Sequence, residues 1–97
     1  MPSAEEITPA ELQGEWLVRR VSGFLPPVGI RKRIGARSGS TRVGRIPVAA
    51  FRVSGLLLDY RWLPVKDELE GLEGGMWQGR GLVLGREFCR FRLVRPE

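Results

Sequence analysis

The stretch "REFCRFRLVR", residues 86–95, decides how this chain folds, because charged and apolar side chains alternate along most of its length. In a β-strand, neighbouring side chains point to opposite faces, so Cys89, Phe91 and Leu93 share one face and lie opposite two arginines. Burying two unpaired arginines in a small core would cost several kcal/mol. We therefore expect the apolar face to point inward and the arginines outward.

The sequence upstream of this strand has a similar texture. After Gly14, short apolar or alternating runs are broken repeatedly by glycine and proline, which is typical of an antiparallel all-β domain. An open sheet of many short strands would expose an apolar face, so closure into a small barrel or a two-sheet sandwich is favoured. The predicted strands are 16–21, 28–34, 41–46, 48–53, 56–62, 76–84 and 86–94.

Two segments have helical signals. In "TPAEL", Thr8 is a residue type that often caps helix N-termini, Pro9 suits the first helical position, and Glu11 stands at the capping-box position. We therefore predict a short N-terminal helix that leans on the body or covers an open end. The segment "PVKDELEGLE", residues 64–73, has helical composition, and we predict a single helical turn there.

The length and composition limit the organisation of the chain. With 97 residues, 42% of them hydrophobic, it has room for one domain with one modest core. We assign 1–13 to a short helical cap and 14–95 to the β-barrel of a single domain, 1–97. One cysteine forms no internal disulfide, and no stretch approaches the roughly 20 apolar residues that cross a bilayer. We therefore expect a cytoplasmic protein without a membrane span.

The net charge of +5 is unevenly distributed. Eight cations and no acid lie between Trp16 and Ile46, whereas acids predominate from Asp59 to Glu73. Such asymmetry indicates a polyanion-binding face, two surfaces that neutralise each other, or the meeting faces of an oligomer. If the partner is a nucleic acid, the residues expected to contact phosphates are Arg31, Lys32, Arg33, Arg37, Arg42 and Arg45.

The sequence contains no recognisable catalytic or metal-binding motif. It has no histidine, and Cys89 has no second cysteine with which to build a zinc site. The glycine-rich "GGMWQGRG" lacks the spacing of a nucleotide-binding loop. We therefore expect no metal and no cofactor, we nominate no catalytic residue, and enzyme activity would rest on fold analogy alone.

The aromatic residues offer a candidate binding surface. Tyr60 and Trp62 flank Arg61, so in a strand their rings would share one face. Together with Trp16 and Trp77, they either line a cavity or fill the core that a small barrel requires.

Gly14, Glu15 and Trp16 follow the short predicted helix, and arginines end the last strand. In these features the chain resembles the lipocalin and calycin superfamily. The resemblance implies an antiparallel up-and-down barrel with a Gly-x-Trp motif entering its first strand. It also implies that an arginine from the last strand, here Arg90, Arg92 or Arg95, lies across the tryptophan and seals the closed end. Such stacking is worth about 0.5–2 kcal/mol.

In the related fatty-acid-binding proteins, an inward Arg-x-Tyr pair holds the ligand carboxylate. Arg90 and Arg92 have that spacing, with arginine in place of tyrosine. The resemblance thus predicts a binding protein for a small hydrophobic or amphipathic ligand, including an anionic one. The expected ligand-binding residues are Trp16, Tyr60, Trp62, Trp77, Arg90 and Arg92. The alternatives are a basic barrel that binds nucleic acid and a structural domain, for example a homodimer.

Overall fold

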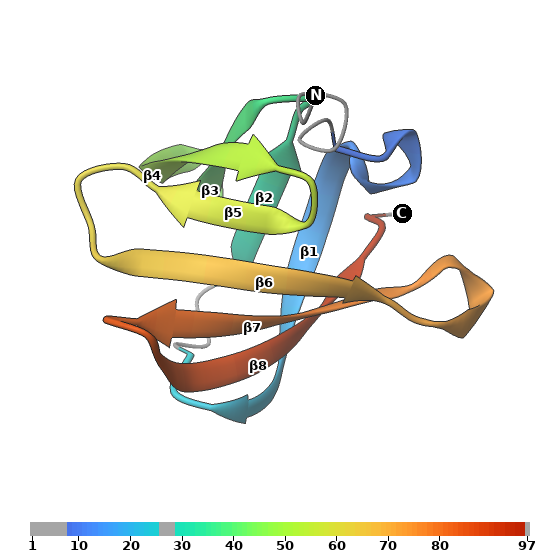
Figure 1. The fold of residues 1–97 in the computed structure, drawn as a ribbon. Coiled ribbons are helices and arrows are strands. Elements are labelled where there is room, and N and C mark those ends of the chain that lie inside the picture. The colour runs from blue at the N-terminus through green and yellow to red at the C-terminus, as the bar shows by residue number, and fades with distance from the viewer. Residues whose placement is uncertain (1–7, 26–28, 97) are drawn as a thin grey trace, which may run out of the picture.

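The structure, a computed structural model, describes residues 8–25 and 29–96 and is a closed barrel of antiparallel strands (Figure 1). Each strand pairs with the next one along the chain, and the last pairs with the first, with Leu17 opposite Val94. The predicted all-β, up-and-down barrel is therefore confirmed. The strands are β1 (Gly14–Gly23), β2 (Ile30–Ile34), β3 (Ser38–Val43), β4 (Ile46–Ser54), β5 (Leu57–Tyr60), β6 (Val65–Gly71), β7 (Trp77–Val83) and β8 (Arg86–Val94).

The predicted N-terminal helix is only a 3-10 turn, η2 (Ala10–Leu12), in the described part of the chain. Thr8 does not cap it. Its hydroxyl instead donates a hydrogen bond to the carbonyl of Ala36 at 3.0 Å, and Pro9 stands at the cap position without a side-chain bond. The capping prediction was wrong because a long-range tertiary contact uses the hydroxyl that the local motif would have used.

The segment predicted as a helical turn is strand β6. It pairs along its length with β7 and over three residues with β5, and these ladders outweigh a weak local preference for helix. A second 3-10 turn, η3 (Glu73–Gly75), follows it. Elsewhere in the described residues, no helix has the length and apolar character needed to cross a membrane.

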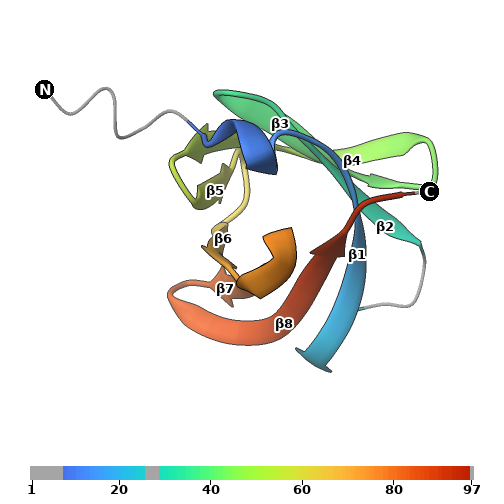
Figure 2. The same ribbon diagram turned by 90° about the vertical axis from the view of Figure 1, so that its right-hand side faces the viewer.

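The barrel has two unlike ends, because successive connections of an up-and-down barrel alternate between its ends. One end carries the β1–β2, β3–β4, β5–β6 and β7–β8 connections and is called the turn end; it lies to the left and lower left in Figure 1. The other carries η2, η3 and the C-terminal end of β8 and is called the plug end. Figure 2 looks onto the plug end of the barrel, in which neighbouring strands follow the order of the chain.

The interior is filled by the chain's own side chains. Cys89, Phe91 and Leu93 of β8 are each at most 2% exposed, so the prediction for the face that points inward is confirmed. Room for the Phe91 ring comes from Gly79 on β7. A Cβ atom there would lie 2.5 Å from the ring and 2.7 Å from Leu69, so only glycine fits without displacing the core.

Candidate functional site

Four strands send polar side chains into the barrel, where they meet in one cluster. Lys32 of β2, Thr41 of β3, Tyr60 of β5 and Asp67 of β6 form this cluster, which is called the polar centre. The Lys32 ammonium nitrogen lies 3.0 Å from Oδ2 of Asp67 and 2.8 Å from the Thr41 hydroxyl, and it also donates to the Tyr60 hydroxyl. The residues come from strands on different sides of the barrel and converge on one ammonium group.

The contacts within the polar centre determine which group donates and which accepts each hydrogen bond. The three ammonium protons of Lys32 match its three acceptors. The Tyr60 hydroxyl donates to Asp67 Oδ2 at 3.0 Å. The Tyr60 hydroxyl also lies 2.6 Å from the Thr41 hydroxyl. Because the Tyr60 proton is already donated to Asp67, Thr41 is the donor in this bond. The ammonium group is fully coordinated, so a molecule that binds to Lys32 must replace one of these partners.

The surroundings of the polar centre are apolar and aromatic. Lys32 and Asp67 are only 4% and 3% exposed, and the Lys32 nitrogen lies 5.1–5.8 Å from the ring centroids of Phe51, Tyr60 and Phe91. Burial acts to lower the pKa of Lys32, but Tyr60 and Asp67 outweigh it and raise that pKa above its usual 10.5. Burial raises the pKa of Tyr60 above 10.0, although Lys32 opposes it. The centre therefore holds a protonated lysine and a neutral phenol at neutral pH.

A ring of apolar side chains lies between the polar centre and the turn end. Its members are half-buried, pack against the core and belong to the turn-end halves of their strands or to the β1–β2 connection. The ring, called the mouth, is formed by Leu25, Ala49, Val65 and Phe88. On the opposite side of the polar centre, Leu12 and Trp16 fill the plug end at 0% and 3% exposure. Apolar side chains thus separate the polar centre from the turn end, and Leu12 and Trp16 cover it at the plug end.

Lys32 and Asp67 were not among the predicted site residues, although the sequence carries a signal for both. Lys32 alternates with Ile30 and Ile34, and Asp67 stands between Val65 and Leu69 at the same spacing. In a strand, this spacing places the charge on the inward face with its apolar neighbours. Lys32 was predicted to contact phosphates, which its burial contradicts.

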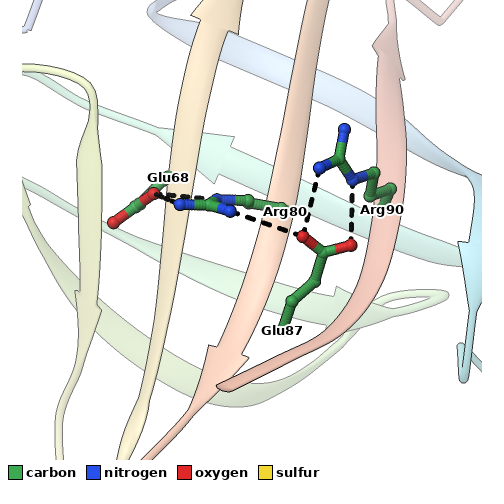
Figure 3. A network of polar contacts seen from close by, with 4 residues as sticks. All are labelled: Glu68, Arg80, Glu87 and Arg90. Atoms are coloured by element: carbon green, nitrogen blue, oxygen red, sulfur yellow. Dashed lines mark hydrogen bonds and ion pairs between the residues drawn. The ribbon is translucent and has the colours of Figure 1, made fainter. Parts of the chain in front are cut away.

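Arg90 and Arg92, predicted to bind a ligand carboxylate, lie on the outer side of the barrel. Arg90 donates to Glu87 at 2.9 Å, and Arg80 links Glu87 to Glu68 across the outside of β6, β7 and β8 (Figure 3). Arg92 is exposed. Neither arginine therefore contributes to the polar interior, and the positive charge of Arg90 is paired with Glu87 on the surface.

Trp16 is held at the plug end by the arginine stacking that the resemblance implies. The guanidinium of Arg95 lies 3.7 Å from the Trp16 ring centroid. It also donates to the carbonyls of Glu11 and Gln13 at 3.0 and 2.9 Å, and the indole nitrogen donates to the carbonyl of Leu12 at 2.7 Å. Of the three candidates, Arg95 is the arginine that covers the tryptophan.

The other two tryptophans do not join Tyr60. Strand β5 ends at Tyr60, and Trp62 follows in the left-handed conformation with φ of 68°. Its side chain is 89% exposed at the turn end, so the expectation that it shares a face with Tyr60 was wrong. Trp77 is half-buried at the start of β7, where it packs beside Gly71. The predicted aromatic residues therefore occupy four separate places.

The basic residues expected to contact phosphates do not form one surface. Arg31 and Arg33 pair with Glu15 at 3.1 and 3.9 Å. Arg42 donates to the carbonyl of Arg45 in the β3–β4 connection at the turn end. Arg37 lies in the β2–β3 connection at the plug end. With Lys32 buried, the run is divided among the interior, the outer wall and both ends.

Comparison of the chain with protein-family models, with curated proteins and with solved structures found no match. Function must therefore be argued from the barrel itself. Its most specific features are the buried polar centre, the apolar mouth above it and the Arg95–Trp16 stack at the closed end.

Proposed function

We propose that this barrel is a calycin-like binding protein for a small, mainly apolar molecule that carries one polar group. The molecule enters at the turn end, its apolar part contacts the mouth, and its polar group reaches the polar centre. The plug end, closed by Leu12 and Trp16, serves as the base of the barrel.

The observation that carries this proposal is the buried ion pair beneath an apolar ring. Replacing a buried pair by apolar residues of similar volume is often neutral or stabilising, so folding alone does not require Lys32 and Asp67. Clusters of buried, perturbed ionisable groups are enriched at functional sites. An apolar approach with few converging polar groups is also the usual composition of a small-molecule site.

The charges of the polar centre favour a neutral polar group over a free carboxylate. Lys32 already has Asp67 as its counterion at 3.0 Å, and a second carboxylate would add an unpaired negative charge to an apolar interior. A carbonyl or hydroxyl oxygen, in contrast, can take over a bond from Lys32 or Tyr60 without changing the net charge. We therefore propose an alcohol, aldehyde, ketone or ester as the ligand class. The experiment below compares these ligands with a fatty acid.

Space limits the size of the ligand. Phe88 is half-buried at the mouth, and its ring lies over Gly81, where an added Cβ would be 2.9 Å away. In this proposal, the Phe88 ring rotates away from β7 to admit the ligand at the mouth. The proposal therefore concerns small molecules, whose apolar part replaces contacts that Phe88 makes in the closed barrel.

Calorimetric titration with a matched series of medium-chain alkane, alcohol, aldehyde and fatty acid tests the proposal. The alcohol or aldehyde should bind more tightly than the alkane and the acid. Tyr60→Phe, which removes a donor to the ligand, should weaken binding about five-fold, the value of one neutral hydrogen bond. Thr41→Val, which removes an acceptor that competes for Lys32, should not weaken it. Arg92→Gln, on the outer wall, is the control and should leave the affinity for each ligand unchanged. Equal affinity for alkane and alcohol, or no saturable binding by any member, would refute the proposal.

A further inference from the structure

The large hydrophobic side chains that remain exposed are gathered at the turn end. The most exposed are Trp62 at 89%, Leu84 at 80% and Phe24 at 74%, and they come from three different connections. Ile46, the first residue of β4 after the β3–β4 connection, is 67% exposed. Val21, Leu63 and Val83 also lie at this end, whereas the plug end contributes Leu56 and Met76, each at 39%.

Two of these side chains are held in a strained backbone conformation. Trp62 and Leu84 are the non-glycine residues with positive φ in the described chain, at 68° and 51°. They are also the two most exposed large hydrophobics. A left-handed residue with a bulky side chain is unfavourable, and so is an exposed indole or isobutyl group. At Leu84 the positive φ belongs to the two-residue turn between the paired residues Val83 and Arg86, a geometry that tight hairpins favour. The exposure of the two large side chains, however, does not benefit folding and indicates a function at the turn tips.

Cations surround these apolar tips. The segments 20–25, 43–46, 61–66 and 83–86, which form the turn end, contain five cations and no acid. Apart from a bond from Arg20 to the carbonyl of Gly23, no hydrogen bond or ion pair is described for their side chains. The five cations are Arg20, Arg45, Arg61, Lys66 and Arg86.

The apolar surface continues from one connection to the next. Trp62 and Leu63 line a shallow hollow with Val48, beside the β3–β4 connection. Leu63 also lines a second hollow with Leu82 and Leu84, beside the β7–β8 connection, where Asp59 and Lys66 are its charged members. The two hollows therefore join apolar side chains beside the β3–β4, β5–β6 and β7–β8 connections, and these connections lie along the left side of the barrel in Figure 1.

We propose that the turn end docks on the surface of an anionic lipid bilayer. Trp62, Leu84 and Phe24 would enter the interfacial layer, while Arg45 and Arg61 contact lipid phosphates. Tryptophan prefers this layer, where its ring meets both apolar and polar surroundings. Basic residues near the surface strengthen such binding through anionic lipids. This inference stands independently of the proposed ligand site, because it uses none of the residues of the polar centre.

A lipid surface fits these observations better than a protein partner. Protein interfaces are enriched in arginine and aromatic residues as well, so Arg61 beside Trp62 does not by itself distinguish the two partners. The turn-end segments, however, combine five cations with no acid, which matches a uniformly anionic lipid surface. Apolar tips that enter the bilayer and arginines at the level of the headgroups match the two layers of a membrane surface.

Co-sedimentation with phosphatidylcholine vesicles, with and without phosphatidylserine, tests the proposal. Binding should require phosphatidylserine and weaken with added salt. Trp62→Gly should weaken it at least about ten-fold, by the loss of one buried apolar side chain, and Leu84→Gly should act similarly. Both variants relieve a positive φ, so they should fold at least as stably as the original chain. Leu56→Ser at the plug end is the control and should bind normally.

A charge-matched pair of variants separates location from net charge. Arg45→Glu at the turn end and Arg37→Glu at the plug end change the net charge equally. The first should weaken vesicle binding about five-fold or more, since each basic residue near the surface contributes about that factor. The second should have a much smaller effect. Equal effects of the two variants would mean that binding follows net charge alone, and the docking proposal would be wrong.

Tryptophan emission provides a direct readout of docking. Trp62 is by far the most exposed of the three tryptophans, since Trp16 is 3% exposed and Trp77 is half-buried, so vesicles should shift the emission to shorter wavelength. Trp62→Gly should remove the shift, and Tyr60→Phe should retain it, which separates docking from ligand binding. An absence of vesicle binding, together with a concentration-dependent dimer that Trp62→Gly abolishes, would identify a protein interface and overturn the proposal.

Discussion

Removing one partner of the buried ion pair should destabilise the barrel far more than removing one partner of a surface pair. In Lys32→Met, a side chain of similar length replaces the ammonium group and leaves Asp67 inside the barrel without its counterion. The carboxylate would retain the Tyr60 hydroxyl as a donor but lose the charge that compensates its burial. The variant thus measures the cost of an uncompensated charge in the core.

The structure gives the size of the effect. Two unit charges 3.0 Å apart attract by about 5 kcal/mol in an effective dielectric of about 20. In the intact pair, desolvation offsets much of this attraction. When only one partner is removed, the desolvation cost of the other remains, and breaking a buried pair costs about 3–5 kcal/mol. A domain of this size has about 5–15 kcal/mol of stability in total, so the loss should be large and measurable.

Urea denaturation followed by tryptophan fluorescence measures the free energy of unfolding of each variant. Lys32→Met and Asp67→Asn should each lose about 3–5 kcal/mol, whereas the double variant should be more stable than either single variant. The control is the pair of Arg31 with Glu15, which has nearly the same separation, 3.1 Å, but side chains 40% and 30% exposed. Arg31→Met should cost less than about 1 kcal/mol.

The double variant allows the coupling to be measured even if a single variant fails to fold. If Lys32→Met unfolds completely, recovery of a cooperative transition on adding Asp67→Asn still demonstrates the coupling. The reasoning is refuted if the two single effects simply add, because the charges would then not interact in the folded protein. It is also refuted if Lys32→Met costs no more than Arg31→Met, because burial would then add nothing to the pair.

Three further predictions follow from other contacts. Arg95→Met should lower the free energy of unfolding by about 1–2 kcal/mol, through loss of the indole stack and of bonds to carbonyls; Arg95→Lys should recover little in the same urea experiment, because an ammonium lacks the planar fork. Tyr60 is the only tyrosine, so tyrosinate absorbance of the folded protein should appear only above its usual pKa of 10.0. Because that pKa is raised, the stability that Tyr60 contributes should be fully present below pH 10.0 and fall as the pH rises beyond it, since the unfolded chain releases its proton first. The check is a smaller fall in Tyr60→Phe, where the raised pKa of Lys32 still makes stability decrease above its usual pKa of 10.5. Gly79→Ala should lower the thermal midpoint through overpacking worth about 1–3 kcal/mol, whereas Gly71→Ala, with its nearest contact at 3.4 Å, should change the midpoint little.

The strand pattern could be predicted from the sequence because it depends on local alternation. The inward position of Cys89, Phe91 and Leu93 followed from period two and the cost of burying arginine. The helical turn predicted at residues 64–73 failed for the opposite reason. Its composition favours helix, but β6 obtains its hydrogen bonds from β5 and β7, which no local pattern describes.

The polar centre was missed for a related reason. A lysine or aspartate in a sequence is usually a solvated side chain, and the meeting of Lys32 with Asp67 depends on the closure of the barrel. The alternation of Lys32 with Ile30 and Ile34 was present in the sequence. Identifying it as inward-facing required accepting a buried charge, which becomes reasonable only when its partner is visible.

The two ends of the barrel differ in local stability, and this difference affects both the ligand proposal and the membrane proposal. Opening the plug end would require Leu12 and Trp16 to leave the core and Arg95 to release its carbonyls. Opening the mouth would move half-buried residues such as Phe88, beside connections that are already strained at Trp62. Local opening favours regions with few buried contacts, so a ligand should reach Tyr60 through the turn end. An orientation with this end on a bilayer would place the mouth at the lipid surface, where small apolar molecules accumulate.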